Sequence, residues 1–190
     1  MEYNQLLDFL KQYAKISKDE ETLIKKCFSV LNLKKKQILI NENFPCNKLF
    51  FVNKGLLRTY YINNKGTEIT RMIAWENRFI TNLVSFKYGE ENNETIECIE
   101  NSEILCIDKD NFDILLKSSL NLKSIYADIL EEYNVLHIKR FQSLQTFDLN
   151  HKFSHLQKYF PQILHRVNDG MIASFLGISR ETYVRNKLKL

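Results

Sequence analysis

The sequence predicts an α+β chain with helices at both ends and a β-roll between them. Three observations predict it: apolar residues repeat with helical spacing near both termini, short β-rich segments separated by turn signals fill the middle, and residues 120–147 contain neither Pro nor Gly. We expect N-terminal helices, a double-stranded β-helix (jelly roll), a long dimerisation helix and a C-terminal helix-turn-helix that lacks a complete wing. With 44% apolar residues, 2 Pro and 5 Gly among 190 residues, the chain should fold throughout.

Two helices are expected before the strands. Within residues 2–14 the apolar positions repeat with helical spacing. Ser17-Lys-Asp-Glu20 has the form of a capping box, in which a serine hydroxyl and a glutamate three residues later satisfy free N–H groups at a helix start. Apolar spacing from Leu23 to Leu31 then predicts a second helix.

Short β-rich segments follow Lys36. Turn signals such as Asn43-Phe-Pro45, Asn53-Lys-Gly55 and the residues up to Gly66 separate them. Seven or eight strands at this spacing are typical of a jelly roll. The expected strands are 37–41, 48–53, 56–63, 68–74, 79–83, 94–99 and 104–107. Asp108 is then expected to cap a short helix over 109–116.

The segment 120–147 predicts one long helix. Its apolar residues follow the 4-3-4-3 spacing of a coiled-coil seam, and the seam residues are Leu122, Tyr126, Ile129, Tyr133 and Leu136. The alternative is a helix packed along its own roll, but a single small roll offers too little surface to cover it. We therefore expect a parallel homodimer.

Residues 169–186 have the form of a helix-turn-helix. Asp148 should cap a preceding helix that Pro161 ends, and Asn168 or Asp169 should cap the first helix of the motif. Gly177 suits the positive φ of the tight turn between the two helices.

Ser179 is expected to cap the second helix of this motif. At about 100° per residue, Arg180, Glu181, Val184 and Arg185 share one polar arc that is free to enter a major groove. Ser179, Tyr183, Asn186 and Leu190 share the arc that packs inward, although Asn186 stands where an apolar residue is usual and Leu188 falls near the polar arc.

The net positive charge of the chain lies wholly in this C-terminal segment. Residues 151–190 hold seven basic and two acidic residues, a net charge of +5, whereas the whole chain carries +4. Residues 1–150 therefore carry −1. A basic surface alone indicates nucleic-acid binding only weakly, but beside a helix-turn-helix it is what attraction to phosphates requires.

This order of elements resembles the Crp/Fnr family of bacterial transcription regulators, and the β-roll is most similar to short members from Bacteroidetes-type bacteria. The motifs that carry the resemblance are Leu49–Arg58 with Tyr60-Tyr61, Gly66-Thr-Glu68, Tyr159-Phe-Pro161 and residues 172–185. The resemblance implies a cytoplasmic, homodimeric regulator that binds palindromic double-stranded DNA and contacts RNA polymerase. Half-sites should lie one helical turn apart, about 34 Å.

The resemblance also assigns bases. Ser179-Arg180-Glu181-Thr182 with Arg185 is similar to the pattern that reads a GTGA-like half-site in the cyclic-AMP receptor branch. Arg180 and Arg185 would donate to guanine O6 and N7, and Glu181 would accept from a cytosine amine. The expected DNA-binding residues, in a recognition helix over 179–188, are Ser179, Arg180, Glu181, Thr182, Arg185 and Lys187.

A ligand site in the roll is expected to be degenerate. Nucleotide-binding members hold the ribose with a Gly-Glu pair and the cyclic phosphate with an Arg-Ser pair, and no arginine occurs here between Arg78 and Arg140. We therefore do not expect cyclic AMP or GMP in that mode. A roll without ligand, an unknown effector and a protein partner stay open. The residues at the aligned positions are Thr81, Asn82, Asn92, Asn93 and Thr95.

No other sensory or catalytic chemistry stands out. The four cysteines lack CxxC or zinc spacing and are expected to be buried, and too few lie near the N-terminus for an iron–sulfur cluster. All four histidines follow the roll, so a cupin-type metal site is not expected. His151 and His155 form an i, i+4 pair that could bind a metal, but we expect both side chains to be solvated. Without a Gly-rich phosphate loop or nucleophile motif, neither an enzyme nor a cofactor is expected.

The predicted domains are a sensor domain over 1–119, a dimerisation helix over 120–147 and a DNA-binding domain over 148–190. The N-terminus lacks the form of a signal peptide and no segment approaches a membrane span. The expected function is a sequence-specific transcription regulator. The alternatives are a small-molecule-binding β-roll module without DNA function and a barrel enzyme.

Overall fold

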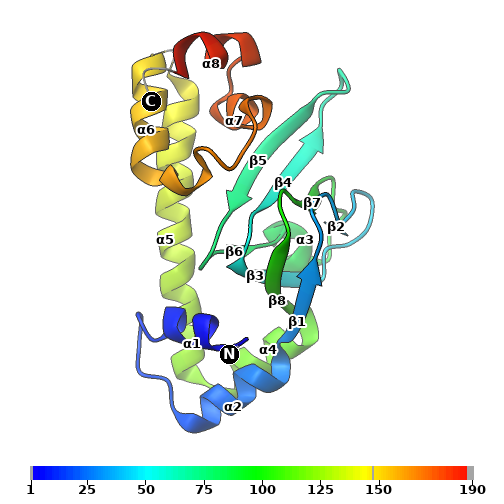
Figure 1. Cartoon of the computed structure of the whole chain (residues 1–190). Helices are drawn as coiled ribbons and strands as arrows, with labels where there is room; N and C mark the ends of the chain where they lie inside the picture. Colours follow the sequence, from blue (N-terminus) through cyan, green and yellow to red (C-terminus); the bar gives the residue numbers. More distant parts are fainter. Residues whose placement is uncertain (1, 147, 188–190) are drawn as a thin grey trace. The chain divides into compact units, whose positions relative to one another are not determined.

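The computed structural model describes residues 2–146 and 148–187. Its elements follow the α+β order predicted by the sequence (Figure 1). The helices are α1 (Asn4–Leu10), α2 (Lys18–Cys27), α3 (Leu83–Tyr88), α4 (Lys109–Ser118), α5 (Leu120–Gln145), α6 (Leu149–Tyr159), the 3-10 helix η1 (Pro161–Ile163), α7 (Asp169–Leu176) and α8 (Arg180–Asn186). The strands are β1 (Ser29–Leu33), β2 (Ile38–Ile40), β3 (Lys48–Lys54), β4 (Leu57–Ile62), β5 (Glu68–Ala74), β6 (Phe79–Ile80), β7 (Thr95–Cys98) and β8 (Ser102–Asp108).

The strands form two four-stranded sheets, which confirms the predicted roll. One sheet has the order β1-β8-β3-β6 and the other β2-β7-β4-β5, and β8 pairs antiparallel with both of its neighbours. The core between the strands is apolar and includes Phe50, Val52, Leu57, Ile96 and Ile104. Their neighbours along β3 and β8 are buried as well, including Phe51 and Leu105, so these two strands are covered on both faces.

The cysteines are buried, as expected. Cys46, Cys98 and Cys106 belong to the core of the roll, and Cys27 is buried on α2. Burial raises the pKa of the Cys98 and Cys106 thiols to about 11 each, because a thiolate is poorly solvated there. These thiols are therefore protonated at neutral pH and behave as small apolar groups.

The predicted end of the second helix was wrong. The second helix ends at Cys27 instead of reaching Leu31, and Ser29–Leu33 is strand β1, paired in register with β8. The segment Ser-Val-Leu-Asn-Leu does not alternate strictly, and its pairing with β8 outweighs the apolar spacing that also fits a helix.

A short helix was also missed. The expected strand over 79–83 ends at Ile80, and α3 follows. Asn82 caps its start by accepting from the Ser85 N–H, and Gly89 ends it with a positive φ of 71°.

The contacts divide the chain into two compact units. The first, called the roll unit, comprises Met1–Thr59 and Ile73–Ile129; the second, called the reader unit, comprises Tyr60–Met72 and Leu130–Leu190. This division differs from the predicted boundaries after 119 and 147, because the hairpin between β4 and β5 groups with the C-terminal helices. The three predicted domains stay a functional prediction.

The long helix α5 is present, but its predicted seam needs correction. Leu122, Ile125 and Ile129 are buried within the single chain, and the Tyr126 ring lies 5.1 Å from that of Phe112 in the roll unit. The first part of the helix therefore packs on its own roll, the alternative that the sequence analysis set aside. A 4-3-4-3 spacing describes one helix face and does not say whose surface covers it. Phe147, the predicted end of the helix, lies outside the described residues.

Exposed apolar side chains on α5 lie on a different stripe. Val135, Ile138 and Phe141 are 47%, 49% and 61% exposed.

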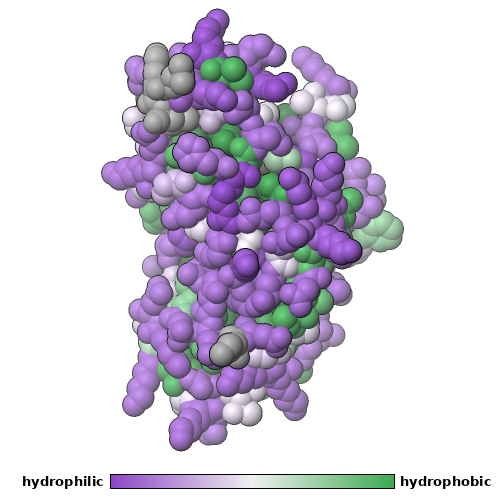
Figure 2. Space-filling model, viewed as in Figure 1, coloured by the Kyte–Doolittle hydropathy of each residue, from purple (hydrophilic) through white to green (hydrophobic). Residues whose placement is uncertain are grey.

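Hydrophilic side chains cover most of the face seen in Figure 2, with smaller hydrophobic areas between them. In the part of the chain that the structure describes, no helix has the length and apolar character to cross a bilayer.

Candidate nucleic-acid interface

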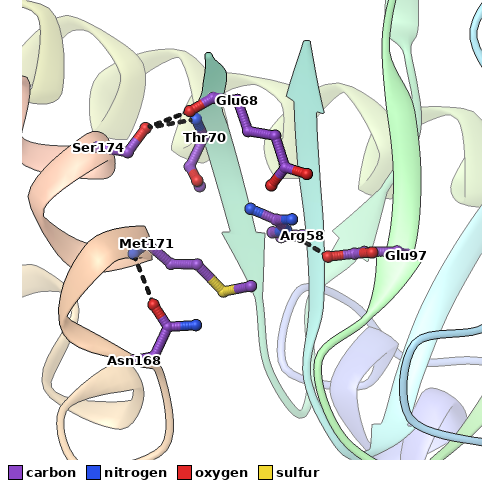
Figure 3. Close-up of polar contacts among 7 residues, drawn as sticks. All are labelled: Arg58, Glu68, Thr70, Glu97, Asn168, Met171 and Ser174. Carbon is purple, nitrogen blue, oxygen red and sulfur yellow. Dashed lines mark hydrogen bonds and ion pairs between the residues drawn. The ribbon is translucent and has the colours of Figure 1, made fainter. Parts of the chain in front are cut away.

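The helix-turn-helix forms with the local contacts that the sequence predicts. Asn168 caps α7 by accepting from the Met171 N–H at 2.9 Å (Figure 3), and Ser179 caps α8 by accepting from the Thr182 N–H at 3.1 Å. Gly177 makes the turn between them with a φ of 66°. These caps satisfy N–H groups that a helix start leaves without partners, so both helices are locally specified.

One face of α8 is buried and the other is open. Tyr183 is 4% exposed, and its ring lies 6.1 Å from that of Phe153 on α6. Arg180, Glu181 and Arg185 are exposed, and so is Val184, at 42%. The predicted polar arc is therefore the solvent-facing side of the helix, with a charged and hydrogen-bonding surface of the size that a major groove admits.

Other predicted DNA-binding residues also have partners inside the chain. The hydroxyls of Ser179 and Thr182 lie 2.9 Å apart, and Lys187 Nζ lies 2.8 Å from a carboxylate oxygen of Asp169. Asn186, on the inner arc, donates to the Thr182 carbonyl oxygen at 2.8 Å. A polar residue at that position is thus satisfied locally. Leu188 and Leu190 lie outside the described residues.

The Glu181 carboxyl is suited to accept hydrogen bonds. Its own main-chain N–H, the Ser179 hydroxyl and nearby Arg180 all lower the pKa of the Glu181 carboxyl below its usual range. The side chain is consequently ionised at neutral pH. An ionised carboxylate accepts hydrogen bonds and donates none, which matches the amine edge of cytosine.

Lys152 anchors the motif from within. This lysine belongs to the cationic excess of the C-terminal segment, yet it is only 3% exposed. Its Nζ donates to the carbonyl oxygens of Leu144 at 3.2 Å and Leu176 at 3.0 Å. Both carbonyls lie in the last turn of a helix, where no intrahelical donor is available. A buried ammonium group thus joins the ends of α5 and α7, and nothing in the sequence pattern distinguished it from a surface lysine.

The hairpin residues of the reader unit also contact α7. The Ser174 hydroxyl oxygen accepts from the Thr70 N–H at 2.9 Å and donates to the Glu68 carbonyl oxygen at 3.2 Å (Figure 3). Arg140 on α5 donates to the carbonyl oxygens of Thr70 and Phe175 at 3.3 and 3.1 Å. These roles of Ser174 and Arg140 have no local sequence signal, because their partners are 35 to 106 residues away.

The histidine pair on α6 differs from the solvated pair that was expected. His151 is exposed, but His155 is 9% exposed, with its ring centroid 4.9 Å from that of Tyr159 and 5.7 Å from that of Phe160. Burial lowers the pKa of His155, and His151, Arg140 and Lys139 lower it further. Among the described residues, no group of three or more His, Cys, Asp or Glu side chains has a metal-binding arrangement.

The residues at the aligned ligand positions, called the cassette, are Thr81, Asn82, Asn92, Asn93 and Thr95. Two of them form a network of hydrogen bonds in the roll unit. Asn82 Nδ2 donates to Asn92 Oδ1 and to Glu94 Oε2, both at 2.9 Å, while Asn92 Nδ2 donates to the carbonyl oxygens of Asn41 and Glu94. Asn82, Asn92 and Glu94 are 8%, 2% and 6% exposed. Glu94 was not singled out by the sequence analysis, although it lies within the aligned cassette.

The remaining cassette residues offer no cation. The Thr81 hydroxyl donates to the Lys48 carbonyl oxygen at 2.7 Å, Asn93 is exposed and Thr95 is buried in β7. The buried arginine of β4, Arg58, binds Glu97 at 2.5 Å (Figure 3). The cassette side chains are amides and hydroxyls beside the Glu94 carboxyl, and none of them is the positively charged donor that a cyclic phosphate requires.

Comparisons with known proteins agree with this architecture. Residues 30–119 match the model of the cyclic nucleotide-binding domain family. Among solved structures, FixK2 from Bradyrhizobium japonicum is 13% identical to this chain and has a TM-score of 0.71. The match covers 86% of this chain and 84% of the FixK2 chain. No curated protein matches the chain.

Two further structures share the fold. A putative transcriptional regulator of the Crp/Fnr family from Eubacterium rectale is 20% identical, with a TM-score of 0.68 and coverage of 92% of this chain and 85% of its own. The c-di-GMP-responsive global regulator CLP of Xanthomonas campestris is 16% identical, with a TM-score of 0.69 and coverage of 91% and 92%. At these identities the likeness concerns the fold.

Proposed function

We propose that this chain is a Crp/Fnr-type, sequence-specific DNA-binding transcription regulator that acts as a homodimer and catalyses no reaction. The observation that carries the proposal is the open face of α8, where Arg180, Glu181, Val184 and Arg185 lie opposite the buried Tyr183. The fold shared with regulators and the match of residues 30–119 support it.

The proposed recognition helix enters the major groove and reads a GTGA-like half-site. Arg180 and Arg185 donate in bidentate fashion to guanine O6 and N7, and Glu181 accepts from a cytosine amine. Ser179 and Thr182 lie at the start of the helix, where hydroxyl groups suit phosphate oxygens. Lys187 contacts a phosphate once its ion pair with Asp169 is shared or opened.

The proposed dimer interface is the exposed stripe of α5. Val135, Ile138 and Phe141 are about half exposed in the single chain, whereas the first part of the helix is already covered. A second copy of the same stripe buries these side chains, and a two-fold dimer matches a palindromic site with half-sites about 34 Å apart.

The roll is proposed to act without a cyclic nucleotide. In the cassette, Asn82 and Asn92 already donate to chain acceptors, and one of these acceptors is the buried carboxyl of Glu94. A cyclic phosphate would require a charged donor at this place and the rupture of that network. The roll therefore serves as a scaffold or as a sensor of another effector, and a small-molecule module without DNA function is the alternative.

DNA selection tests the main proposal. Selection from a randomised duplex pool should yield a palindrome, and Arg180→Ala should weaken binding to it by about 1 to 3 kcal/mol and relax the preference at one base of each half-site. Lys158→Ala, which removes one exposed charge from α6, is the matched control and should lower affinity equally for all sequences. If no palindrome is selected, or if Arg180→Ala binds as tightly and selectively as the wild type, the chain is not a specific reader.

Thermal unfolding with cyclic AMP and cyclic GMP tests the roll. A ligand at 100 times its Kd stabilises a protein by about 2.7 kcal/mol. We expect no shift of the melting temperature with either nucleotide at millimolar concentration. A clear shift of the wild type with either nucleotide would contradict the proposal, and a shift that is equally large in Glu94→Gln would show that Glu94 does not oppose binding.

A further inference from the structure

We propose that Ser174 is a positioning residue which fixes the helix-turn-helix against the β4–β5 hairpin and thereby sets the spacing between the two reading helices of a dimer. The contacts of Glu68, Thr70, Arg140, Ser174 and Phe175 are called the hairpin clip. The inference rests on the proposed function. All five residues belong to the reader unit.

The clip uses the open edge of a sheet. β5 is the outermost strand of the order β2-β7-β4-β5, so the polar groups on one of its sides have no strand partner. Residues 68 and 70 are two apart, so their main-chain groups point to the same side of the strand. The Ser174 hydroxyl accepts from the Thr70 N–H at 2.9 Å and donates to the Glu68 carbonyl oxygen at 3.2 Å. One side chain therefore takes the place of a neighbouring strand (Figure 3).

Arg140 closes the clip from α5. It donates to the Thr70 carbonyl oxygen at 3.3 Å and to the Phe175 carbonyl oxygen at 3.1 Å, and its guanidinium carbon lies 4.2 Å from the centroid of the Phe175 ring. Both main-chain groups of Thr70 are thus bound by groups from two different helices. Arg140 joins α5, β5 and α7 as a planar, multidentate donor, a role that lysine does not reproduce.

The clip orients the helix-turn-helix relative to the β4–β5 hairpin and is not needed to fold the motif. Tyr183 packs on α6 and Lys152 binds the ends of α5 and α7, so the two helices of the motif have their own core. The clip instead joins α7 to a hairpin whose two ends continue into the roll unit after Met72 and before Tyr60. In a dimer held by α5, the angle between α5 and α7 sets the distance between the two recognition helices.

Removing the hydroxyl leaves a main-chain group without a partner. Thr70 is 1% exposed, so water cannot readily replace Ser174 beside its N–H. The cost of an unsatisfied buried group falls on the docked arrangement and not on the folded motif. We expect the helix-turn-helix without the Ser174 hydroxyl to keep its base preference and to lose its fixed orientation relative to the hairpin.

The test uses the full chain and duplexes that carry the selected palindrome with its spacer altered by one or two base pairs. Wild type should bind the selected spacing best. Ser174→Ala should reduce this discrimination by about three- to tenfold, the change expected for one buried hydrogen-bonding group, with the half-site sequence preference unchanged. Ser174→Thr keeps a hydroxyl and should restore discrimination. Ser154→Ala, at an exposed serine of α6, is the matched control and should behave as wild type.

Hydrogen exchange of the Thr70 amide provides a readout that does not depend on DNA. Exchange should be slow in wild type and in Ser174→Thr, and faster in Ser174→Ala. Equal affinity losses at all spacings in Ser174→Ala would indicate a purely structural role and overturn the proposal, as would faster exchange with unaltered discrimination. Should wild type select no palindrome, the proposed function fails together with this inference; a selected palindrome with unaltered spacing discrimination defeats the inference alone.

Discussion

At the scale of residues, positively charged side chains have opposite roles in different parts of the reader unit. Arg180 and Arg185 face solvent on α8, whereas Lys152 is buried and binds helix ends. The predicted excess of positive charge therefore overstates the charge that is available to DNA. Attraction to phosphates depends on exposed cations, and burial decides which cations count.

His155 makes the reader unit sensitive to acid. Its Nε2 has no hydrogen-bond partner among the described residues, and burial lowers its pKa in the folded state from the ordinary 6.5. The unfolded chain therefore binds a proton first as the pH falls. The contribution of His155 to stability should be complete above about pH 6.5 and decline below it, with a slope of at most about 1.4 kcal/mol per pH unit for one group.

Urea unfolding of the wild type at pH 7.5 and 5.5 measures this effect. His155→Phe keeps an aromatic ring without a titrating group and should lose less stability between the two pH values. His165→Asn, at an exposed histidine that does not contribute to the pKa shift of His155, should retain the wild-type dependence. Parallel pH profiles for wild type and His155→Phe would refute the role of His155.

At the scale of elements, helix ends and turns were predictable because their signals are local. Ser17, Asp108, Asp148 and Ser179 all cap helices as predicted. A cap needs only a side-chain oxygen two or three residues before the N–H that it binds, so sequence spacing defines it. The strand β1 and the helix α3 were missed because pairing with β8 and capping by Asn82 compete with the apolar pattern.

Two glycines with a positive φ allow a comparison of what an added Cβ costs in stability. Gly177 has a positive φ of 66°, and a Cβ there would lie 3.1 Å from Leu144 Cδ2; Gly66, in the hairpin, has a φ of 73° and open space around it. Gly66→Ala should cost about 1 kcal/mol of reader-unit stability from the left-handed backbone alone, and Gly177→Ala about 2 kcal/mol because Leu144 must also move. Urea unfolding of both variants measures the difference; equal losses would mean that Leu144 yields without cost.

At the scale of the whole molecule, α5 takes part in two compact units. Its first part packs on the roll, and its second part carries an exposed apolar stripe. Coiled-coil spacing therefore predicted the helix and the need to cover it, but assigned the partner wrongly for Leu122 and Ile129. Which surface covers a helix face is a property of the tertiary structure.

The exposed stripe predicts how the dimer is broken. A glutamate at Ile138 would place two charges in the proposed apolar interface, so Ile138→Glu should shift the chain from dimer to monomer at micromolar concentration, as measured by sedimentation velocity. Ile114 on α4 is 51% exposed, close to the 49% of Ile138, and Ile114→Glu is therefore the matched control that should remain dimeric. A monomeric wild type, or a dimeric Ile138→Glu, would contradict an interface formed by this stripe.

By itself the sequence determined the α+β order, the long helix, the capped helix-turn-helix and the polar arc of α8, because each depends on residues close together in the chain. Only the tertiary structure decided that Lys152 is buried, that Ser174 binds the edge of β5, and that Asn82, Asn92 and Glu94 hydrogen-bond to one another in the roll. The β5 contact joins residues about a hundred positions apart, and the buried groups depend on which surfaces cover them. Local spacing encodes helices and turns, whereas burial and long-range pairing are decided when the elements pack together.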